Sequence, residues 1–323
     1  MTTRHVIAVV GATATGKSAL GEALAEALGG EVVCADSRQV FAELDLGTGK
    51  PSLEERGRRP HHLFEALHLG DRPSAGWYAR ECATTRAEIH ARGAIPIVVG
   101  GSGLWLRAAM VGLAGTPPHD PAIRARLAAE AAALGAPALH ARLDAVDPIT
   151  AARLHPHDTQ RITRALEVVE TSGRLLSSWH AEQHPTDGDE RWHVFELEVE
   201  PGALNRRIRL RAEWMFASGL LEETRALLEG EHAAALRALQ AIGYDEAVAH
   251  LAGTCSRTKA IKHVSLRTRQ LAKRQRTWFR HQLHAVRLAA DPIDTAAWVA
   301  FVRARLPADV ASRGHDIDRP GRD

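Results

Sequence analysis

Apolar residues in the first third of the chain alternate between short runs and helical spacings. The run at residues 5–10 is rich in valine and isoleucine and ends at a glycine, which is typical of a buried parallel strand. Leu20, Leu24 and Leu28 then recur every four residues and predict a helix, before a second apolar run at residues 32–35. The order strand, helix, strand indicates an α/β fold.

The same alternation continues before it is interrupted. Helical spacing over residues 77–91 leads into a buried strand at residues 95–99 and a helix at residues 103–111. From residue 117 to residue 188, prolines and glycines separate short helical patterns, and we expect no strand there. Alternation of apolar and polar residues returns at 192–199 and predicts another strand.

The last part of the chain is predicted to be mostly helical. Apolar spacing predicts helices at about residues 204–228, 233–250 and 258–288. The residues after Pro307 mix glycine, proline and charge, and we expect them to be disordered. We therefore assign an α/β core, with a parallel sheet flanked by helices, to residues 1–116 and 189–323, and an inserted all-helical domain to residues 117–188.

Charge changes this picture in one region. The 323-residue chain has a net charge of +2, yet residues 247–290 hold ten Lys or Arg and no Asp or Glu. The remainder is therefore net acidic, and an anion-binding surface is predicted on the last long helix. Four cations on that helix are spaced to share one face: Arg269, Lys273, Arg276 and Arg280. A basic helix that is merely solvated is the alternative.

Cysteine usage and hydropathy limit the cellular setting. Cys34, Cys82 and Cys255 are far apart and form no CxxC pair, so neither a disulfide framework nor a zinc site is predicted. No run of 18 apolar residues is present, and the first residues lead directly into a strand pattern, so we expect neither a membrane span nor a signal peptide. We expect a cytoplasmic monomer.

A glycine-rich loop between the first predicted strand and helix is the first chemical motif. It matches GxxxxGK followed by Ser or Thr, and its members are Gly11, Ala12, Thr13, Ala14, Thr15, Gly16, Lys17 and Ser18. Backbone N–H groups of such a P-loop bind phosphate, the lysine reaches a phosphate oxygen, and the serine hydroxyl can hold Mg²⁺. The motif predicts a bound di- or triphosphate but does not select the reaction.

Further blocks of the sequence narrow the choice of reaction. They lie at residues 36–41, 45–51, 61–63, 100–105, 158–168, 241–244 and 270–280. In content and order, these blocks and the P-loop resemble the tRNA dimethylallyltransferase family over about residues 5–285. The chain departs from the usual family residues, mostly conservatively, at Ala12, Ser18, Phe41, Ser102, Trp105 and Pro73-Ser74. These departures bear on the choice of prenyl donor more than on the type of reaction.

The resemblance implies a reaction and its catalytic groups. The family transfers a dimethylallyl group from dimethylallyl diphosphate to the N6 amine of adenosine 37, beside the anticodon, in tRNAs that read codons starting with U. By resemblance, Asp36 would take the proton of the amine and Ser102 would contact the bridging oxygen. Lys17 and the rest of the P-loop would bind the diphosphate with Arg207 or Arg211, and Mg²⁺ would be held at Ser18.

The resemblance also implies where tRNA binds. The implied contacts are Asp36, Ser37, Arg38, Gln39, Ser102, Arg124, Gln160, Arg161, Ile162, Thr163, Arg164, Ala241, Ile242, Gly243, Tyr244, Lys273, Arg274, Gln275, Arg276 and Arg280. The helical insertion is expected to contact the tRNA as well. Trp278 and Phe279 lie in the same block as several of these contacts, and the alternative interpretation is that they belong to the core.

Other interpretations have to be weighed against this one. A small-molecule or nucleotide kinase would explain the P-loop, but neither the block at 36–39 nor the acid-free helix. A non-catalytic RNA-binding protein would not need the P-loop, and an enzyme acting on free adenine nucleotides would not need the basic helix. Asp36 could instead cap a helix or bind Mg²⁺. We reject a zinc site at residues 61–62 or 155–158, because no further ligand stands at a fixed spacing.

Overall fold

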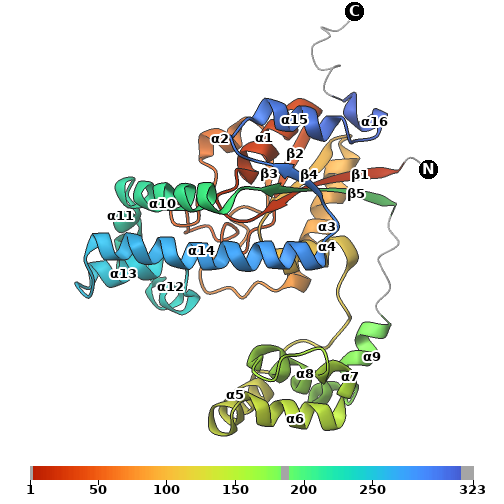
Figure 1. The fold of residues 1–323 in the computed structure, drawn as a ribbon, viewed down its shortest axis with the longest axis vertical. Coiled ribbons are helices and arrows are strands. Elements are labelled where there is room, and N and C mark those ends of the chain that lie inside the picture. The colour runs from red at the N-terminus through yellow and green to blue at the C-terminus, as the bar shows by residue number, and fades with distance from the viewer. Residues whose placement is uncertain (1–2, 183–188, 314–323) are drawn as a thin grey trace, which may run out of the picture. The chain divides into compact units, whose positions relative to one another are not determined.

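The structure is a computed structural model that describes residues 3–182 and 189–313 (Figure 1). The chain divides into two compact units. The core unit contains Met1–Met110 and Gly188–Asp323, and the helical unit contains Val111–Asp187. The sequence placed these divisions at residues 117 and 188.

A six-stranded sheet forms the centre of the core unit. Its strands are β1 (Arg4–Gly11), β2 (Gly30–Cys34), β3 (His61–His62), β4 (Ile95–Gly100), β5 (Glu190–Glu198) and β6 (Val286–Ala289). The spatial order is β3-β2-β4-β1-β5-β6, and every neighbouring pair is parallel. The carboxyl ends of β1, β2 and β4 therefore meet at one edge, which is where open α/β sheets build their sites.

Helices cover both faces of this sheet. They are α1 (Lys17–Leu28), α2 (Leu53–Gly57), α3 (Ala75–Ala91), α4 (Gly103–Val111), α10 (Pro201–Ala217), α11 (Leu220–Glu229), α12 (Ala233–Leu239), α13 (Tyr244–Leu251), α14 (Arg257–Gln282), α15 (Thr295–Arg303) and α16 (Ala308–Ala311). Along β1, Ile7 and Val9 face α1 and α15, whereas Val6, Ala8 and Val10 face α3, α4 and α14 (Figure 1). Burial of a valine or isoleucine side chain contributes about 1.5–3 kcal/mol. The apolar residues 6–10 of β1 thus belong to two cores, one on each face of the sheet.

The helical unit has a core of its own. It consists of α5 (Pro121–Leu134), α6 (Ala136–Val146), α7 (Pro148–Ala151), α8 (Thr159–Ser172) and α9 (Leu176–Ala181). Leu127, Leu143 and Ile162 are fully buried between its helices. The described residues of this unit include no strand, as the prolines and glycines predicted.

Three predicted helices end earlier than the sequence indicated. The helix expected at residues 204–228 is divided into α10 and α11 at Gly219, whose φ of 112° is left-handed. The helix expected at 233–250 is divided into α12 and α13, with Gly243 at a φ of 98°. The helix expected at 258–288 ends at Gln282, and the chain then adds β6 to the sheet edge.

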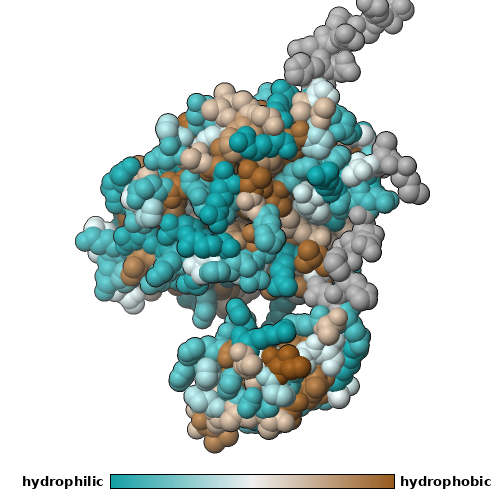
Figure 2. Space-filling model, turned by 45° about the vertical axis from the view of Figure 1, so that its right-hand side comes forward, coloured by the Kyte–Doolittle hydropathy of each residue, from teal (hydrophilic) through white to brown (hydrophobic). Residues whose placement is uncertain are grey.

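The C-terminal residues also differ from the prediction. Disorder after Pro307 is wrong for residues 308–311, which form α16, and the predicted disorder from residue 314 onward lies outside the described residues. The helix α15 was not predicted. On the face shown in Figure 2, hydrophilic residues predominate and apolar residues form small islands. Within the described residues, none of the helices has the length and apolar character that crossing a membrane requires.

Candidate active site at the carboxyl edge of the sheet

The P-loop connects β1 to the first turn of α1. Gly11 and Gly16 have φ of 146° and 101°, which other residues rarely adopt. A Cβ built on Gly11 would also lie 2.9 Å from the carbonyl oxygen of Leu197 on β5. The Thr15 hydroxyl and the Lys17 ammonium donate to the carbonyl of Ala12 over 2.8 and 2.7 Å. The loop is thus a tight cradle at a helix N-terminus, the usual geometry of a phosphate site.

Lys17 stands in an unusual electrostatic environment. Desolvation lowers the pKa of its ammonium to about 8, with the charge of Arg211 adding to the shift and that of Asp36 opposing it. Desolvation also lowers the pKa of Arg211, again opposed by Asp36. Two cations and one carboxylate therefore share a partly dry site, which favours the binding of further negative charge.

Asp36 and Ser102 follow β2 and β4, and their turns are tied together. The Ser37 N–H donates to Ser102 Oγ over 2.9 Å, and the Ser102 N–H donates to the Ala35 carbonyl over 3.1 Å. The Arg38 N–H donates to Asp36 Oδ1 over 2.9 Å. A Cβ on Gly100 would lie 2.0 Å from the Ala35 carbonyl, which explains the glycine there. Asp36 and Ser102 are thus held at one edge with their backbones fixed.

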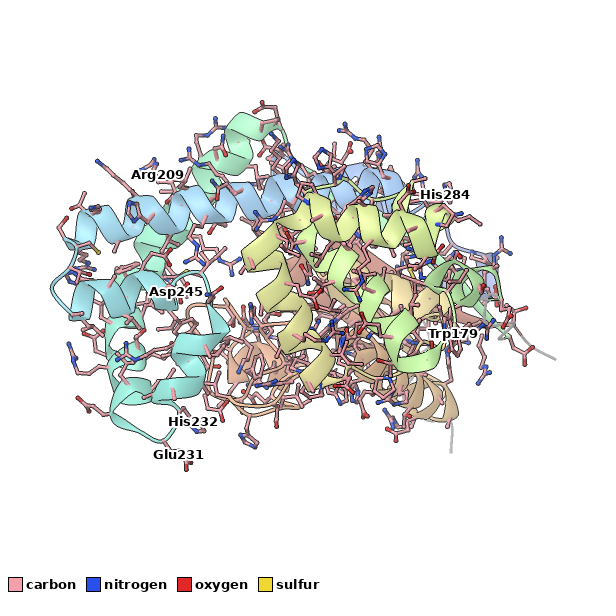
Figure 3. The ribbon with its side chains drawn as sticks, turned by 90° about the horizontal axis from the view of Figure 1, so that it is seen from below. Trp179, Arg209, Glu231, His232, Asp245 and His284 are labelled. Atoms are coloured by element: carbon pink, nitrogen blue, oxygen red, sulfur yellow. The ribbon has the colours of Figure 1, made fainter. Side chains whose placement is uncertain are left out.

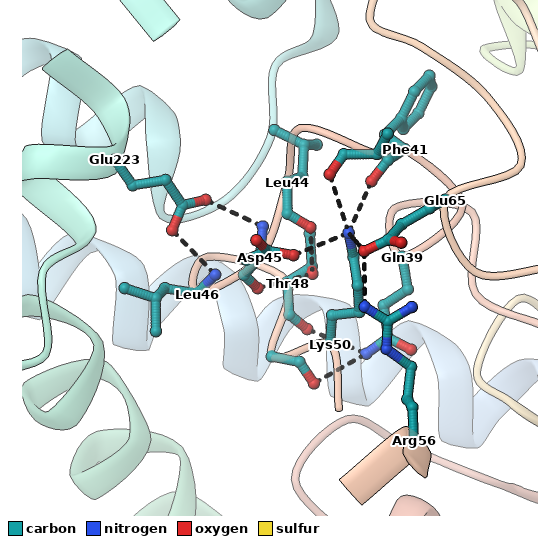
Figure 4. A network of polar contacts seen from close by, with 12 residues as sticks. Gln39, Phe41, Leu44, Asp45, Leu46, Thr48, Lys50, Arg56, Glu65 and Glu223 are labelled. Atoms are coloured by element: carbon teal, nitrogen blue, oxygen red, sulfur yellow. Dashed lines mark hydrogen bonds and ion pairs between the residues drawn. The ribbon is translucent and has the colours of Figure 1, made fainter. Parts of the chain in front are cut away.

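Residues 45–50 form a loop (Figure 4), in which Thr48 lines the same two cavities as Asp36. Glu223 on α11 accepts the N–H groups of Asp45 and Leu46 over 2.9 and 3.0 Å, and also the hydroxyl of Tyr244. The Lys50 side chain, only 1% exposed, pairs with Asp45 at 2.8 Å and donates to the Phe41 carbonyl over 3.0 Å. Lys50 therefore stabilises the loop from inside.

The other end of this loop is tied to site residues. The Gln39 amide donates to the Gly49 carbonyl over 3.0 Å (Figure 4). Arg211 Nη2 donates to the Thr48 carbonyl over 2.7 Å. A Cβ on Gly49 would lie 2.1 Å from Arg211 Nη2, and one on Gly47 would lie 2.3 Å from the ring of Tyr244. The two glycines thus admit side chains from α10 and α13.

The helix α14 contacts the turn after β4. Gln275 accepts from the Thr13 N–H over 2.9 Å and donates to the Gly101 carbonyl over 3.0 Å, so it joins the P-loop to that turn. A Cβ on Gly103 would lie 2.3 Å from the ring of Trp278. Gln275 is thus a link inside the site, a role that sequence spacing did not predict.

Two cavities meet at Asp36. The first, which we call the P-loop cavity, measures about 400 Å³ and is lined by the P-loop, Phe64, Arg207 and Ile293. The second, the α14 cavity, measures about 650 Å³ and is lined by Ser37, Arg38, Ser102, Ile242, Arg274 and other residues of α14. Thr13, Asp36, Thr48 and Arg211 line both. A group bound in one cavity can therefore approach a group bound in the other at Asp36.

The two candidate arginines of α10 differ in their partners. Arg207 pairs with Asp291 at 2.8 Å and donates to the carbonyls of Ala290 and Thr15 over 2.8 and 3.3 Å. Arg211 donates to the neutral carbonyl of Thr48, and among the described residues no carboxylate lies within 4 Å of it. Arg211 therefore keeps more of its charge available to a ligand.

Several residues predicted to contact tRNA are buried or already bonded within the protein, and their role as direct contacts stays a prediction. Ile162, Ala241 and Tyr244 are 0%, 3% and 0% exposed. Arg164 is occupied inside the helical unit, where its guanidinium bonds Glu167 at 3.1 Å and the Pro117 carbonyl at 2.8 Å. Of these residues, Ala241 lines the α14 cavity. The sequence could not separate them from their exposed neighbours, because helical spacing does not show which face is covered.

Other predicted contacts remain at the surface. Arg124, Gln160 and Arg161 are exposed on the helical unit, and Thr163 is half-buried. On α14, Arg269, Lys273, Arg274 and Arg280 are exposed and Arg276 is half-buried. No carboxylate of the described chain lies within 4 Å of these five α14 cations. By contrast, Arg267 on the same helix pairs with Glu246 and with Asp245, which lies on α13 (Figure 3). Phe279 is in the core, as one of the two interpretations proposed.

The histidine pairs form local contacts. His61 Nδ1 lies 2.8 Å from the Arg59 carbonyl, His62 Nε2 lies 2.6 Å from Glu31, and the rings of His155 and His157 lie 5.5 Å apart in an exposed turn. Residues 3–182 and 189–313 contain no group of three or more His, Cys, Asp or Glu side chains that could hold a metal ion.

Comparisons with known proteins agree with this geometry. The IPP transferase model matches residues 39–282, and the isopentenyl transferase model matches residues 4–64. The chain belongs to the IPP transferase family. The tRNA dimethylallyltransferase of Geobacter sulfurreducens is 46% identical over 275 residues, which cover 85% of this chain and 88% of the relative. That of Anaeromyxobacter dehalogenans is 45% identical over 295 residues, which cover 91% and 95%.

Solved structures of the family have the same fold. The tRNA isopentenylpyrophosphate transferase of Bacillus halodurans is 30% identical with a TM-score of 0.67, and the match covers 93% of this chain and 94% of that one. A eukaryotic dimethylallyltransferase acting on tRNA is 27% identical with a TM-score of 0.79, covering 94% and 79%. The predicted resemblance and the P-loop NTPase-like α/β fold are confirmed.

Proposed function

We propose that this protein transfers a dimethylallyl group from dimethylallyl diphosphate to the N6 amine of adenosine 37 in tRNAs that read codons starting with U. Family membership supports tRNA modification by prenyl transfer. One observation of the structure carries the chemistry: Asp36 lies where the P-loop cavity and the α14 cavity meet. A donor in one cavity and an acceptor in the other can therefore approach the same carboxylate.

The P-loop cavity suits the diphosphate of the donor. Lys17 and Arg211 are desolvated cations, and the backbone N–H groups of a P-loop add further donors. Such groups stabilise the charge that grows on the diphosphate as its bond to C1 of the prenyl group breaks. Arg211 is our choice for the principal arginine, because Arg207 is already paired with Asp291. Ser102, tied to the turn of Asp36, is placed to contact the bridging oxygen.

The α14 cavity suits the adenine. A base stacked in an anticodon loop cannot reach a carboxylate inside a protein, so the nucleotide has to be flipped out. The amine of the flipped base attacks C1, the new N6–C1 bond forms, the C1–O bond breaks, and Asp36 takes the proton of the amine. Diphosphate and prenylated tRNA are the products.

Mg²⁺ fits the oxygen donors of the P-loop cavity. The Ser18 hydroxyl and the Asp36 carboxylate both line it, and Mg²⁺ commonly combines one or two protein oxygens with phosphate oxygens. Ser18 would hold the ion, which would neutralise charge on the diphosphate.

The exposed cations of α14 would bind phosphates of the tRNA, and on the helical unit Arg124, Gln160 and Arg161 are exposed candidates for tRNA contacts. Phosphates of a polyanion release counterions when they meet such cations, which favours binding without reading sequence. Because tRNA is the substrate, we place the protein in the cytoplasm.

The test is a product analysis. The protein is incubated with Mg²⁺, dimethylallyl diphosphate and an unmodified tRNA transcript, and nucleosides are analysed by mass spectrometry. We expect adenosine 37 to gain one C5H8 unit. The matched control is the same tRNA with guanosine at position 37, which should gain nothing. Rapid cleavage of the terminal phosphate of ATP, with no prenylated tRNA, would instead favour a kinase.

A further inference from the structure

Residues 286–313, which we call the C-terminal segment, follow the end of the family match at residue 282. The segment adds β6 to the sheet beside β5 and then lays α15 on α1. Trp298 and Val302 of α15 are buried in the same apolar cluster as Leu24 and Leu28 of α1. Arg303 also bonds the Ala27 carbonyl near the end of α1. The segment is thus fixed to the helix that begins at the P-loop.

The first contact with the donor site is made by Trp298. Its side chain is 3% exposed, and a Cβ built on Gly16 would lie 3.0 Å from the indole ring. Gly16 is the residue before Lys17 and has a left-handed φ of 101°. The indole therefore supports the P-loop at the point where its backbone turns into α1.

The second contact is made by Asp291. Its carboxylate pairs with Arg207 Nη2 at 2.8 Å, and the same nitrogen donates to the Ala290 carbonyl over 2.8 Å. The other terminal nitrogen of Arg207 reaches the carbonyl of Thr15 over 3.3 Å. Arg207 thus links the C-terminal segment to the P-loop, and Ile293, two residues after Asp291, lines the P-loop cavity itself.

We infer that the C-terminal segment is a positioning element of the donor site, in which Asp291 orients Arg207 against the P-loop and Trp298 supports the backbone at Gly16. The inference rests on the proposed function, because it takes the P-loop cavity as the diphosphate site. Neither residue touches the diphosphate or the prenyl group. Trp298 acts by supporting the P-loop, and Asp291 acts by fixing Arg207, which bonds the P-loop and lines the P-loop cavity as a second cation beside Arg211. No residue of the α14 cavity other than Arg211 is involved.

A purely structural role is the competing explanation. If the segment only completed the core, its variants would lower the temperature of unfolding and leave the folded protein with normal donor binding. If it positions the donor site, the Michaelis constant for dimethylallyl diphosphate has to change while that for tRNA does not. Amide exchange of the P-loop would also rise without a general rise across the sheet.

The experiment compares Asp291→Asn and Trp298→Leu with the wild-type protein. The first change keeps the size of the side chain, and the second keeps an apolar side chain in the cluster. For Asp291→Asn we expect the KM for dimethylallyl diphosphate and the inhibition constant of inorganic pyrophosphate to rise by about tenfold, the scale of one charge-assisted hydrogen bond. For Trp298→Leu we expect a smaller rise, with faster amide exchange at residues 11–18. Asp291→Glu should recover part of the loss.

The matched control is Asp309→Asn, which changes an exposed carboxylate of the same segment that lies 3.7 Å from His5, away from the P-loop. It should leave both constants unchanged. A lower unfolding temperature with unchanged KM, pyrophosphate inhibition and P-loop exchange in both test variants would overturn the inference. Failure of the wild-type protein to use the donor would count against the proposed function, while P-loop exchange would still decide whether the segment positions the loop.

Discussion

The two cavities that meet at Asp36 differ in how their charged groups are held. The cations of the P-loop cavity, Lys17 and Arg211, are desolvated and fixed by short bonds to backbone carbonyls. The cations of α14 beyond the second cavity, such as Arg269 and Lys273, are exposed, and the described residues offer them no carboxylate within 4 Å.

The difference suggests a division of labour. Fixed, desolvated donors act strongly on a small anion whose charge changes during a reaction. Exposed cations on long side chains bind a large polyanion through many weak interactions that salt screens. Substitutions on the two sides should therefore separate cleanly into effects on donor chemistry and effects on tRNA affinity, with Asp36 affecting catalysis alone.

The largest effect on catalysis is expected at Asp36, where the two cavities meet. Asp36→Ala removes the proposed base, so kcat should fall by about 10²–10⁴-fold, the usual contribution of a general base. The dissociation constant for tRNA, measured by filter binding, should hardly change. Asp36→Asn, which keeps an acceptor for the Arg38 N–H, should be as inactive as Asp36→Ala. Equal losses of catalysis and of tRNA affinity would contradict the base role.

Next in size is the loss of Arg211. Arg211→Ala should lower kcat/KM for dimethylallyl diphosphate by about 10²–10³-fold, since one fixed donor to developing charge contributes on that scale. The matched control is Arg209→Ala on the same helix (Figure 3), because Arg209 is 58% exposed and its one ion pair among the described residues is with Glu213, four residues along the helix. Steady-state kinetics with saturating tRNA gives the comparison, and similar losses in the two variants would remove the distinction.

A smaller effect is expected on α14. Arg269→Ala and Lys273→Ala together should weaken tRNA binding and reduce the slope of log K against log salt by about 0.7–0.9 for each phosphate that is no longer neutralised. The KM for dimethylallyl diphosphate should stay the same. Arg305→Ala, an exposed cation on the C-terminal segment, is the control and should leave the salt slope unchanged. An unchanged slope in the α14 variant would mean that the helix is merely solvated.

The smallest effect is one of pH. Because desolvation lowers the pKa of Lys17 to about 8, the lysine is a cation below that pH and loses its proton as the pH rises through it. We expect kcat/KM for the donor, which reports groups of the free enzyme, to fall above about pH 8. Affinity for tRNA, which depends largely on arginines, should change little up to about pH 9, far below the usual pKa of arginine. A flat donor profile over this range would argue against a cationic Lys17 in the site.

Much of the fold could be predicted, because its strongest signals are local. Apolar runs ending at glycine indicated β1 and β4, and the sequence motif GxxxxGK followed by Ser indicated the P-loop. The errors came from tertiary context. β6 has a single buried residue, Leu288, and its four residues continue the helical pattern of α14 closely enough to be taken for it.

The candidate site was predicted in its residues more than in its connections. Glu223 contacts Asp45 across 178 residues of sequence, and Gln275 contacts Thr13 across 262. Pairings of this kind carry no local signal. Burial was missed for the same reason: Tyr244 belongs to a recognisable block, yet its ring packs on Gly47 rather than at the surface. Trp298 lies in a helix that the pattern did not indicate.

The most direct test of the account is a structure of the protein with an unmodified tRNA anticodon stem-loop and a non-reactive thio analogue of dimethylallyl diphosphate. We predict that the adenine N6 lies within about 2.6–3.2 Å of an Asp36 carboxylate oxygen, the range for a base that takes a proton directly. The adenine should approach from the α14 cavity, with the diphosphate against Lys17 in the P-loop cavity. An adenine bound far from Asp36, or a diphosphate outside the P-loop, would contradict the central claim.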